Sequence, residues 1–259
     1  MNNLNQKIKW LISDILVMTK RNLIRYVRLP QLLIFSTIQP VMFVLLFAYV
    51  FGGAINIPGL NYISYLLPGI IVQTVIFGST QTGVGLADDL SRGMIDRFRS
   101  LPMARSAVLA GRTLADTARN IFVVLLMTLV GYAIGFRFHN GFFNFVGALS
   151  LTVLFGFAFS WISATIGLLV KNTETAQVAG FIWVFPLVFI SSIFVPTTNM
   201  PWLFKAFAQS SPITITVDAV RKLSLGGQVT PTIWYSLIWI VAILLVFIPL
   251  AVSRYRKIT

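Results

Sequence analysis

Long apolar stretches without charge alternate with short polar segments along this chain. No charged residue occurs between Arg28 and Asp88, and a cluster of turn residues around Gly52 and Pro58 divides this interval. About 20 helical residues, each rising 1.5 Å, cross a bilayer core of about 30 Å, so the interval is long enough for two crossings. The same pattern predicts six apolar spans: residues 31–51, 62–87, 114–136, 142–170, 176–195 and 232–252.

The spans are predicted to be helices rather than barrel strands. They lack the alternation of polar and apolar positions that barrel strands have, and a lipid-exposed backbone must satisfy its hydrogen bonds internally. We therefore expect an all-α polytopic membrane protein, folded as a single unit over residues 1–259. Its parts are a cytoplasmic interfacial helix (1–30), a six-span bundle (31–252) and a cytoplasmic tail (253–259).

Two further patterns predict helices that do not cross the membrane. Between residues 4 and 23, apolar side chains recur at spacings of three, four and seven, which is typical of an amphipathic helix lying in the interface. Near the end of the chain, Pro201 and Pro212 suit first helical positions, Ser211 suits an N-cap, and Gly226 suits a stop. The two helices so delimited, of roughly 9 and 13 residues, are too short to cross, so we expect them to re-enter the outer interface before span six.

Composition and charge narrow the class of protein. Of the 259 residues, 57% are hydrophobic and only 10% are charged, which excludes a water-soluble globule. The net charge of +13 comes from basic residues that cluster before span one, after spans two and four, and in the tail. The positive-inside rule therefore puts both termini in the cytoplasm, and it accounts for the basic charge without nucleic-acid binding.

Several kinds of chemistry are absent from the sequence. There is no cysteine, and the lone His139 has no second histidine beside it for a metal site. No Gly-Lys pair occurs, so the chain lacks the phosphate-binding loop of an ATPase. We expect neither a metal nor a cofactor in this chain.

The cytoplasmic segment after span two carries an apolar stripe. Leu90, Met94, Phe98 and Leu101 are spaced to share one face of a short helix that ends at Pro102. Such a helix is suited to docking into a groove of a soluble partner. The alternative is a helix that only caps the bundle.

Polar side chains within the spans offer two further hypotheses. Asp116 has Arg112 and Arg119 on its own helix face at the start of span three. We interpret the three residues as an ion-pair relay that transmits motion of the loop, with proton transfer as the less favoured alternative. The second hypothesis is a substrate pathway, and it includes Gln73, Thr80, Phe185 and Phe189. Ordinary helix packing would explain the same residues.

Several motifs occur in the order found in a known family. They include the run 86–120, Tyr65–Gly69, Met200–Trp202 and Asp218–Arg221. On these, the chain resembles type-2 ATP-binding-cassette (ABC) exporter permeases, particularly the daunorubicin/doxorubicin-resistance type. The resemblance implies six spans, pairing with a second permease copy, and two copies of a separate ATPase that binds ATP and Mg²⁺. It also implies that the ATPase docks on the segment after span two, through Leu90, Met94, Ile95, Phe98, Arg99 and Leu101.

The resemblance leads to a functional expectation. The chain should be the membrane subunit of an exporter in a bacterial or archaeal cell membrane, moving a drug-like amphipathic compound, a lipid or a lipid-linked glycan outward. The alternative is an ion- or proton-coupled secondary carrier without an ATPase. Such a carrier usually has carboxylates at mid-membrane and an internal repeat, and neither is visible in the sequence.

Overall fold

The computed structural model describes the chain except for residues 1, 53–59, 100–102, 171, 229, 258 and 259. All regular elements in the described part are helical. They are α1 (Asn2–Arg28), α2 (Pro30–Leu46) with a π-helical turn (Phe47–Phe51), α3 (Tyr62–Ser91), α4 (Met94–Arg99), α5 (Arg105–Ala133), α6 (Gly141–Gly167), α7 (Thr173–Phe189), a 3₁₀ turn (Thr197–Asn199), α8 (Trp202–Ser210), α9 (Pro212–Leu225) and α10 (Thr230–Lys257).

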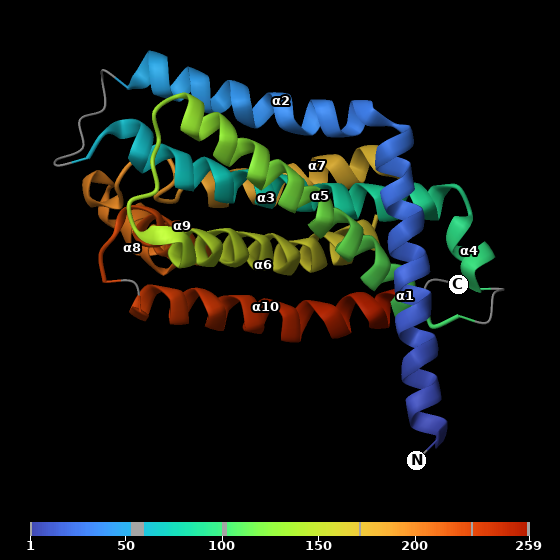
Figure 1. Ribbon diagram of the computed structural model, residues 1–259. Coiled ribbons are helices and arrows are strands. Elements are labelled where there is room, and N and C mark those ends of the chain that lie inside the picture. The colour runs from blue at the N-terminus through green and yellow to red at the C-terminus, as the bar shows by residue number, and fades with distance from the viewer. Residues whose placement is uncertain (1, 53–59, 100–102, 171, 229, 258–259) are drawn as a thin grey trace.

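Six of these helices form an elongated bundle, in which α2, α3, α5, α6, α7 and α10 run along one common direction (Figure 1). The central helix is α3, which packs against α5, α6, α7 and α9. It approaches α6 closely because both helices have glycine at the crossing: a Cβ on Gly83 would lie 2.4 Å from the Ser163 carbonyl oxygen. Small residues at such crossings are typical of helix packing in membranes.

Within the described residues, five segments are long and apolar enough to cross a membrane. They lie at Leu33–Val50, Tyr62–Ser91, Ser106–Ala133, Gly141–Gly167 and Thr230–Lys257. The third of these helices, α5, begins at Arg105 rather than near residue 114 as the charge pattern predicts. Its first turns are helical although they contain arginines, because α1 packs along them.

The expected span at 176–195 differs most from the prediction. The helix, α7, has 17 residues and ends at Phe189, so it is about 26 Å long, a little shorter than the bilayer core. Beyond it the chain continues as buried irregular backbone through Ser192 and Phe194. This backbone needs no helix because side chains from α3 and α9 bind its carbonyl groups: Tyr65 donates to the Ser192 oxygen at 2.9 Å, and so does Arg221.

The amphipathic pattern of residues 4–23 is part of a longer helix. Helix α1 extends to Arg28 and lies across one end of the bundle, nearly at right angles to it (Figure 1). It packs on α5 through Met18 and Tyr26, which are buried, whereas Trp10 and Leu16 on the opposite side are exposed.

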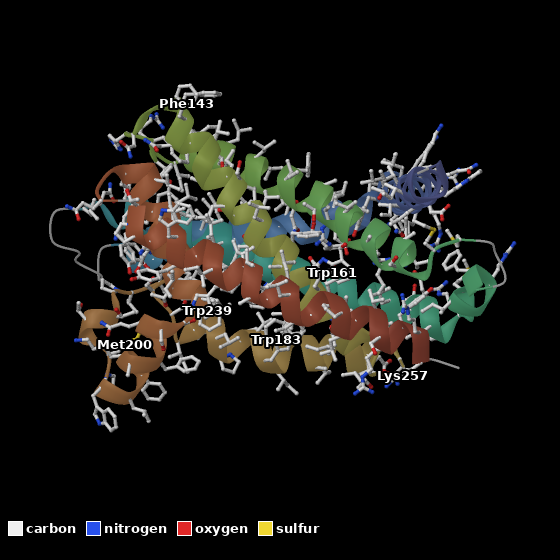
Figure 2. The ribbon with its side chains drawn as sticks, turned by 90° about the horizontal axis from the view of Figure 1, so that it is seen from below. Phe143, Trp161, Trp183, Met200, Trp239 and Lys257 are labelled. Atoms are coloured by element: carbon white, nitrogen blue, oxygen red, sulfur yellow. The ribbon has the colours of Figure 1, made fainter. Side chains whose placement is uncertain are left out.

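The two ends of the bundle carry different helices. Helix α4 and the C-terminal end of α10 lie at the same end as α1, and α8 and α9 lie at the other end (Figure 1). Figure 2 shows Phe143 and Met200 toward one end and Lys257 toward the other. The two short helices are present as the sequence predicts, with the Ser211 hydroxyl accepting from the Ile213 amide at 3.3 Å and Gly226 at φ 106° ending α9.

Candidate transport pathway and coupling surface

The apolar stripe after span two does not lie on one short helix. Leu90 belongs to the last turn of α3, and a turn at Arg92 and Gly93, with Gly93 at φ 66°, separates it from α4. This corrects the prediction of a single helix carrying Leu90, Met94, Phe98 and Leu101. Helix α3 is stabilised beyond the membrane core by contacts with α1, so it extends further than the sequence indicates.

Two of the expected docking residues are buried within this chain. Ile95 is 1% exposed and Phe98 is 8% exposed. They belong to an apolar cluster at this end of the bundle that also contains Met18, Leu109 and Tyr255. Leu90 and Met94 are partly buried against the same cluster. The Arg99 side chain and Leu101 lie outside the described residues. Ile95 and Phe98 thus hold α4 against the bundle.

Helix α1 is tied to the α3–α5 connection by ion pairs. Arg25 lies 3.0 Å from Asp88, which also pairs with Arg92 at 2.8 Å. Arg21 lies 3.6 Å from Asp89, and its guanidinium stacks over the Phe98 ring at 4.6 Å. At the far side of α4, the Ala104 amide donates to the Asp14 carboxylate of α1 at 3.1 Å. These contacts join α1 to the end of α3, to α4 through Phe98, and to the segment before α5.

Asp116 lies at the centre of a buried polar cluster, three turns inside α5. Its carboxylate has no exposed surface; it accepts hydrogen bonds from Tyr26 and, at 2.5 Å, from Thr82, and it lies 3.5 Å from Arg112. Arg119 does not complete the predicted trio. It donates instead to the Gly78 carbonyl of α3 at 2.5 Å. The cluster therefore joins α1, α3 and α5 rather than one helix face.

Burial raises the pKa of Tyr26, which lies in α1 outside the spans, to about 12; the neighbouring Asp116 adds to the shift. The phenol is thus neutral throughout the physiological range and acts as a hydrogen-bond donor to the carboxylate.

A cavity of about 600 Å³ opens beside this cluster, between α1, α2, α3, α5 and α7. Many of its lining residues carry polar or charged side chains, among them Arg25, Arg112, Gln39 and Gln177. A smaller pocket of about 80 Å³ continues from it toward the middle of the bundle and is lined by Gln73 and Thr80. Two of the four predicted pathway residues therefore share one polar pocket.

The other two predicted pathway residues lie elsewhere. Phe185 and Phe189 are 41% and 48% exposed on the outer surface of α7, with their rings stacked at 5.7 Å. The row continues through Phe194 to Phe47 on the α2 side, at ring distances of 5.3 Å and 4.7 Å. They form an aromatic surface rather than a lining of the cavity.

The opposite end of the bundle holds a polar cluster that the sequence analysis did not single out as a site. Arg221 of α9 donates to Asp218 at 2.7 Å and to the Ser192 carbonyl, and its guanidinium stacks over the Tyr65 ring at 3.6 Å. The Asp218–Arg221 spacing was the only available signal, since Tyr65 and Ser192 are distant in sequence. Likewise, the spacing of Arg21 and Arg25 was the only signal for the pairs with Asp88 and Asp89.

Comparison with known proteins agrees with this architecture. The sequence pattern of the family described as "ABC-2 type transporter" matches residues 13–225, which is most of the chain. The daunorubicin resistance ABC transporter permease protein DrrB1 of Streptomyces coeruleorubidus is 33% identical over 246 residues, covering 95% of this chain and 87% of that protein.

More distant relatives cover similar lengths. The probable doxorubicin resistance ABC transporter permease protein DrrC of Mycobacterium tuberculosis is 26% identical over 250 residues, covering 96% of this chain and 90% of its own length. The putative transport permease ycf38 of Cyanophora paradoxa is 26% identical over 216 residues, covering 82% of this chain and 74% of its own length. These relatives are named as permeases, the transport components of ABC systems. On its family match, its apolar helices and its relatives, this chain belongs to the ABC-2 type transporter family as a membrane permease subunit and is not an enzyme.

Proposed function

We propose that this chain is the permease of an ATP-driven exporter that moves an amphipathic compound out of a bacterial or archaeal cell. The observation that supports this most directly is the polar cavity of about 600 Å³ at the end of the bundle that carries α1 and α4. It combines an opening lined by charged side chains with a route toward the bundle interior. A drug-like compound, a lipid and a lipid-linked glycan all have the amphipathic character that such a route suits.

Membership of the family implies a separate ABC ATPase, and we place its docking surface on α4. Because Ile95 and Phe98 are buried, the docking surface consists of the outward side of α4, including Met94 and the exposed Arg97, together with the end of α3 at Leu90. Two ATPase copies would bind ATP and Mg²⁺, and this chain would supply no cofactor. Movement of α4 would reach Asp116 through the ion pairs of α1.

We further propose that two permease copies form the pathway, each crossing the membrane six times. In this arrangement α7, with the buried irregular segment after it, makes the fifth crossing along the chain and α10 makes the last, α1 lies in the interface, and both termini are cytoplasmic. The common end of α1, α4 and the α10 terminus supports an even number of crossings (Figure 1). Sixteen of the twenty basic residues belong to the segments at that end.

The alternative, a secondary carrier driven by an ion gradient, is not favoured. The relatives are ABC permeases, and Asp116, the carboxylate deepest in a span, is held by Tyr26, Thr82 and Arg112 rather than facing the cavity. A carboxylate so engaged is a structural group rather than an exchangeable proton carrier.

The test is ATP-dependent transport with a defined partner. The tagged permease would be co-expressed with an ABC ATPase from the same genome, and inside-out membrane vesicles would be supplied with doxorubicin or a fluorescent phospholipid. We expect the ATPase to co-purify and the vesicles to accumulate one of the probes only with ATP.

The control is an ATPase whose phosphate-loop lysine is replaced, which should assemble but not transport. Accumulation that needs an imposed proton gradient and is unchanged by this ATPase variant would contradict the proposal and support the secondary carrier.

A further inference from the structure

Three hollows in the structure lie next to one another and share a wall residue. The cavity of about 600 Å³, the inner pocket of about 80 Å³ and a groove of about 290 Å³ along α2 all include Gln39 in their walls. The groove is apolar apart from that glutamine and is lined by Phe35, Ile38, Met42 and Phe43 among others. A single bound molecule could therefore contact a charged, a polar and an apolar surface at once.

The inner pocket contains buried polar atoms that lack partners. Gln73 Oε1 and Asn120 Nδ2 make no hydrogen bond, although both residues are at least 95% buried and line the pocket. The Asn120 amide is oriented by Arg119, which donates to Asn120 Oδ1 at 3.2 Å and leaves the amide nitrogen free. The Asn120 nitrogen faces Gly156 of α6, outside the pocket lining, whereas Gln73 lines the pocket. The unpartnered Gln73 oxygen therefore indicates a binding position for a polar group.

Positively charged side chains outnumber negatively charged ones in the lining of the large cavity. The large cavity is lined by four arginines, Arg25, Arg92, Arg112 and Arg119, and by one carboxylate, Asp88, which already pairs with Arg25 and Arg92. Arg119 lines both the large cavity and the inner pocket and is 5% exposed. No carboxylate among the described side chains lies within ion-pair distance of it. The junction of the two hollows therefore favours an anion and disfavours a cation.

We propose that this site binds amphiphiles that carry an anionic headgroup, a phosphate or a carboxylate. The headgroup accepts hydrogen bonds from Arg119, a hydroxyl or amide next to it donates to Gln73, and the apolar tail lies in the α2 groove between Phe35 and Met42. Guanidinium groups bind phosphate and carboxylate oxygens in pairs, which suits this role. The inference rests on the proposed function in one respect: the bound amphiphile is the molecule exported.

Binding would be measured on the permease alone, in nanodiscs of phosphatidylcholine, by displacement of a fluorescent lysophosphatidic acid analogue, with empty nanodiscs subtracted. Dodecyl phosphate, dodecyltrimethylammonium and inorganic phosphate would compete. We expect dodecyl phosphate to bind at least about tenfold more tightly than the other two, because only it supplies both the anion and the tail.

Two variants probe the pocket by different routes. Arg119→Gln should weaken dodecyl phosphate about tenfold, and Arg119→Lys should weaken it less, because lysine keeps the charge but loses the paired hydrogen bonds. Because Arg119 is buried, its replacement also acts on folding, so the second probe is Gln73→Glu, which keeps the size and adds a negative charge. It should weaken binding of the anion about tenfold and leave binding of the cation unchanged or improved. The matched control is Gln209→Glu on the exposed surface of α8, which should change neither.

Equal competition by dodecyltrimethylammonium, equal competition by inorganic phosphate, or unchanged selectivity in Gln73→Glu would each overturn the inference. None of these results affects ATP-driven transport or ATPase co-purification, on which the proposed function depends. Conversely, anion selectivity in a permease that binds no ATPase would contradict the proposed function and would leave the inference about anion binding intact.

Discussion

At the scale of single residues, the buried Asp116 carboxylate is held by three partners, Tyr26, Thr82 and Arg112. Replacing it with asparagine keeps its size but leaves the Arg112 charge buried, with only Asp89 at 4.0 Å in partial compensation. Removing one partner of a buried ion pair costs about 3 kcal/mol or more. We therefore expect Asp116→Asn to lower the unfolding midpoint in detergent clearly, as followed by thermal unfolding.

The matched control is Glu174→Gln, an exposed carboxylate in the first turn of α7, which should change stability by no more than about 0.5 kcal/mol. Equal midpoints for the two variants would show that the Asp116 cluster contributes nothing to folding.

Tyr26 gives a prediction with a pH signature. The pKa of its phenol is raised from 10.0 to about 12, so the folded chain holds this proton more tightly than the unfolded chain does. Its contribution to stability is therefore complete below pH 10 and is lost as the pH rises toward 12. Tyr26→Phe should be less stable at pH 8 by about 1.5–3 kcal/mol, because a hydrogen bond to a charged group is lost. The difference from the parent should shrink between pH 10 and 12 in a denaturation series; a constant difference would contradict the assignment.

At the scale of helices, the α3–α6 crossing depends on glycine. A Cβ on Gly83 would lie 2.4 Å from the Ser163 oxygen, and the backbone would have to move to make room for it. A Cβ on Gly147 of α6 would meet only Leu223 side-chain carbons, at 3.6 Å or more. Gly83→Ala should therefore destabilise the chain by about 1–3 kcal/mol. Gly147→Ala should be neutral or stabilising by up to about 1 kcal/mol. Thermal unfolding of the pair checks this, and identical shifts would argue against a close crossing.

Helix α4 has an inner and an outer side with different roles. Phe98→Ala should destabilise this end of the bundle by about 3 kcal/mol, because the ring is buried within the chain. Arg97→Glu, on the exposed side, should lower the unfolding midpoint less than Phe98→Ala does and should reduce recovery of the ATPase on purification. Because Phe98 is buried within the chain, we expect the outer side of α4, rather than Phe98 itself, to contact the ATPase. Full ATPase recovery with Arg97→Glu would move the docking surface away from α4.

At the scale of the whole molecule, pairing of two copies predicts which surfaces meet. Phe189 on α7 and Leu125 on α5 are 48% and 49% exposed, so cysteines at the two positions would be equally accessible. The chain has no native cysteine to interfere. If α7 forms the seam, Phe189→Cys should give cross-linked dimers in membranes and Leu125→Cys should not. Cross-linking at Leu125 alone would place the seam on α5.

The sequence by itself determined the all-helical fold class, the two short helices near the end and the family. These properties depend on local hydrophobicity, on caps such as Ser211 and on ordered motifs, all of which can be read without knowing which helices are neighbours. The sequence also predicts that polar side chains in a span turn away from lipid, and Gln73 and Thr80 are indeed buried and line one pocket. Their part in a substrate pathway stays a prediction.

Only the tertiary structure decided the extent of α5 and α7, the side of α4 that is buried and the partners of Asp116. Each depends on contacts between residues far apart in the chain: Tyr26 reaches Asp116 across 90 positions, and Arg221 reaches Tyr65 across 156. In a medium with little water, buried polar groups must find partners within the protein, and the packing of helices determines which partners are within reach. The hydrophobic pattern specifies that such groups face inward, and the packed bundle specifies what they meet.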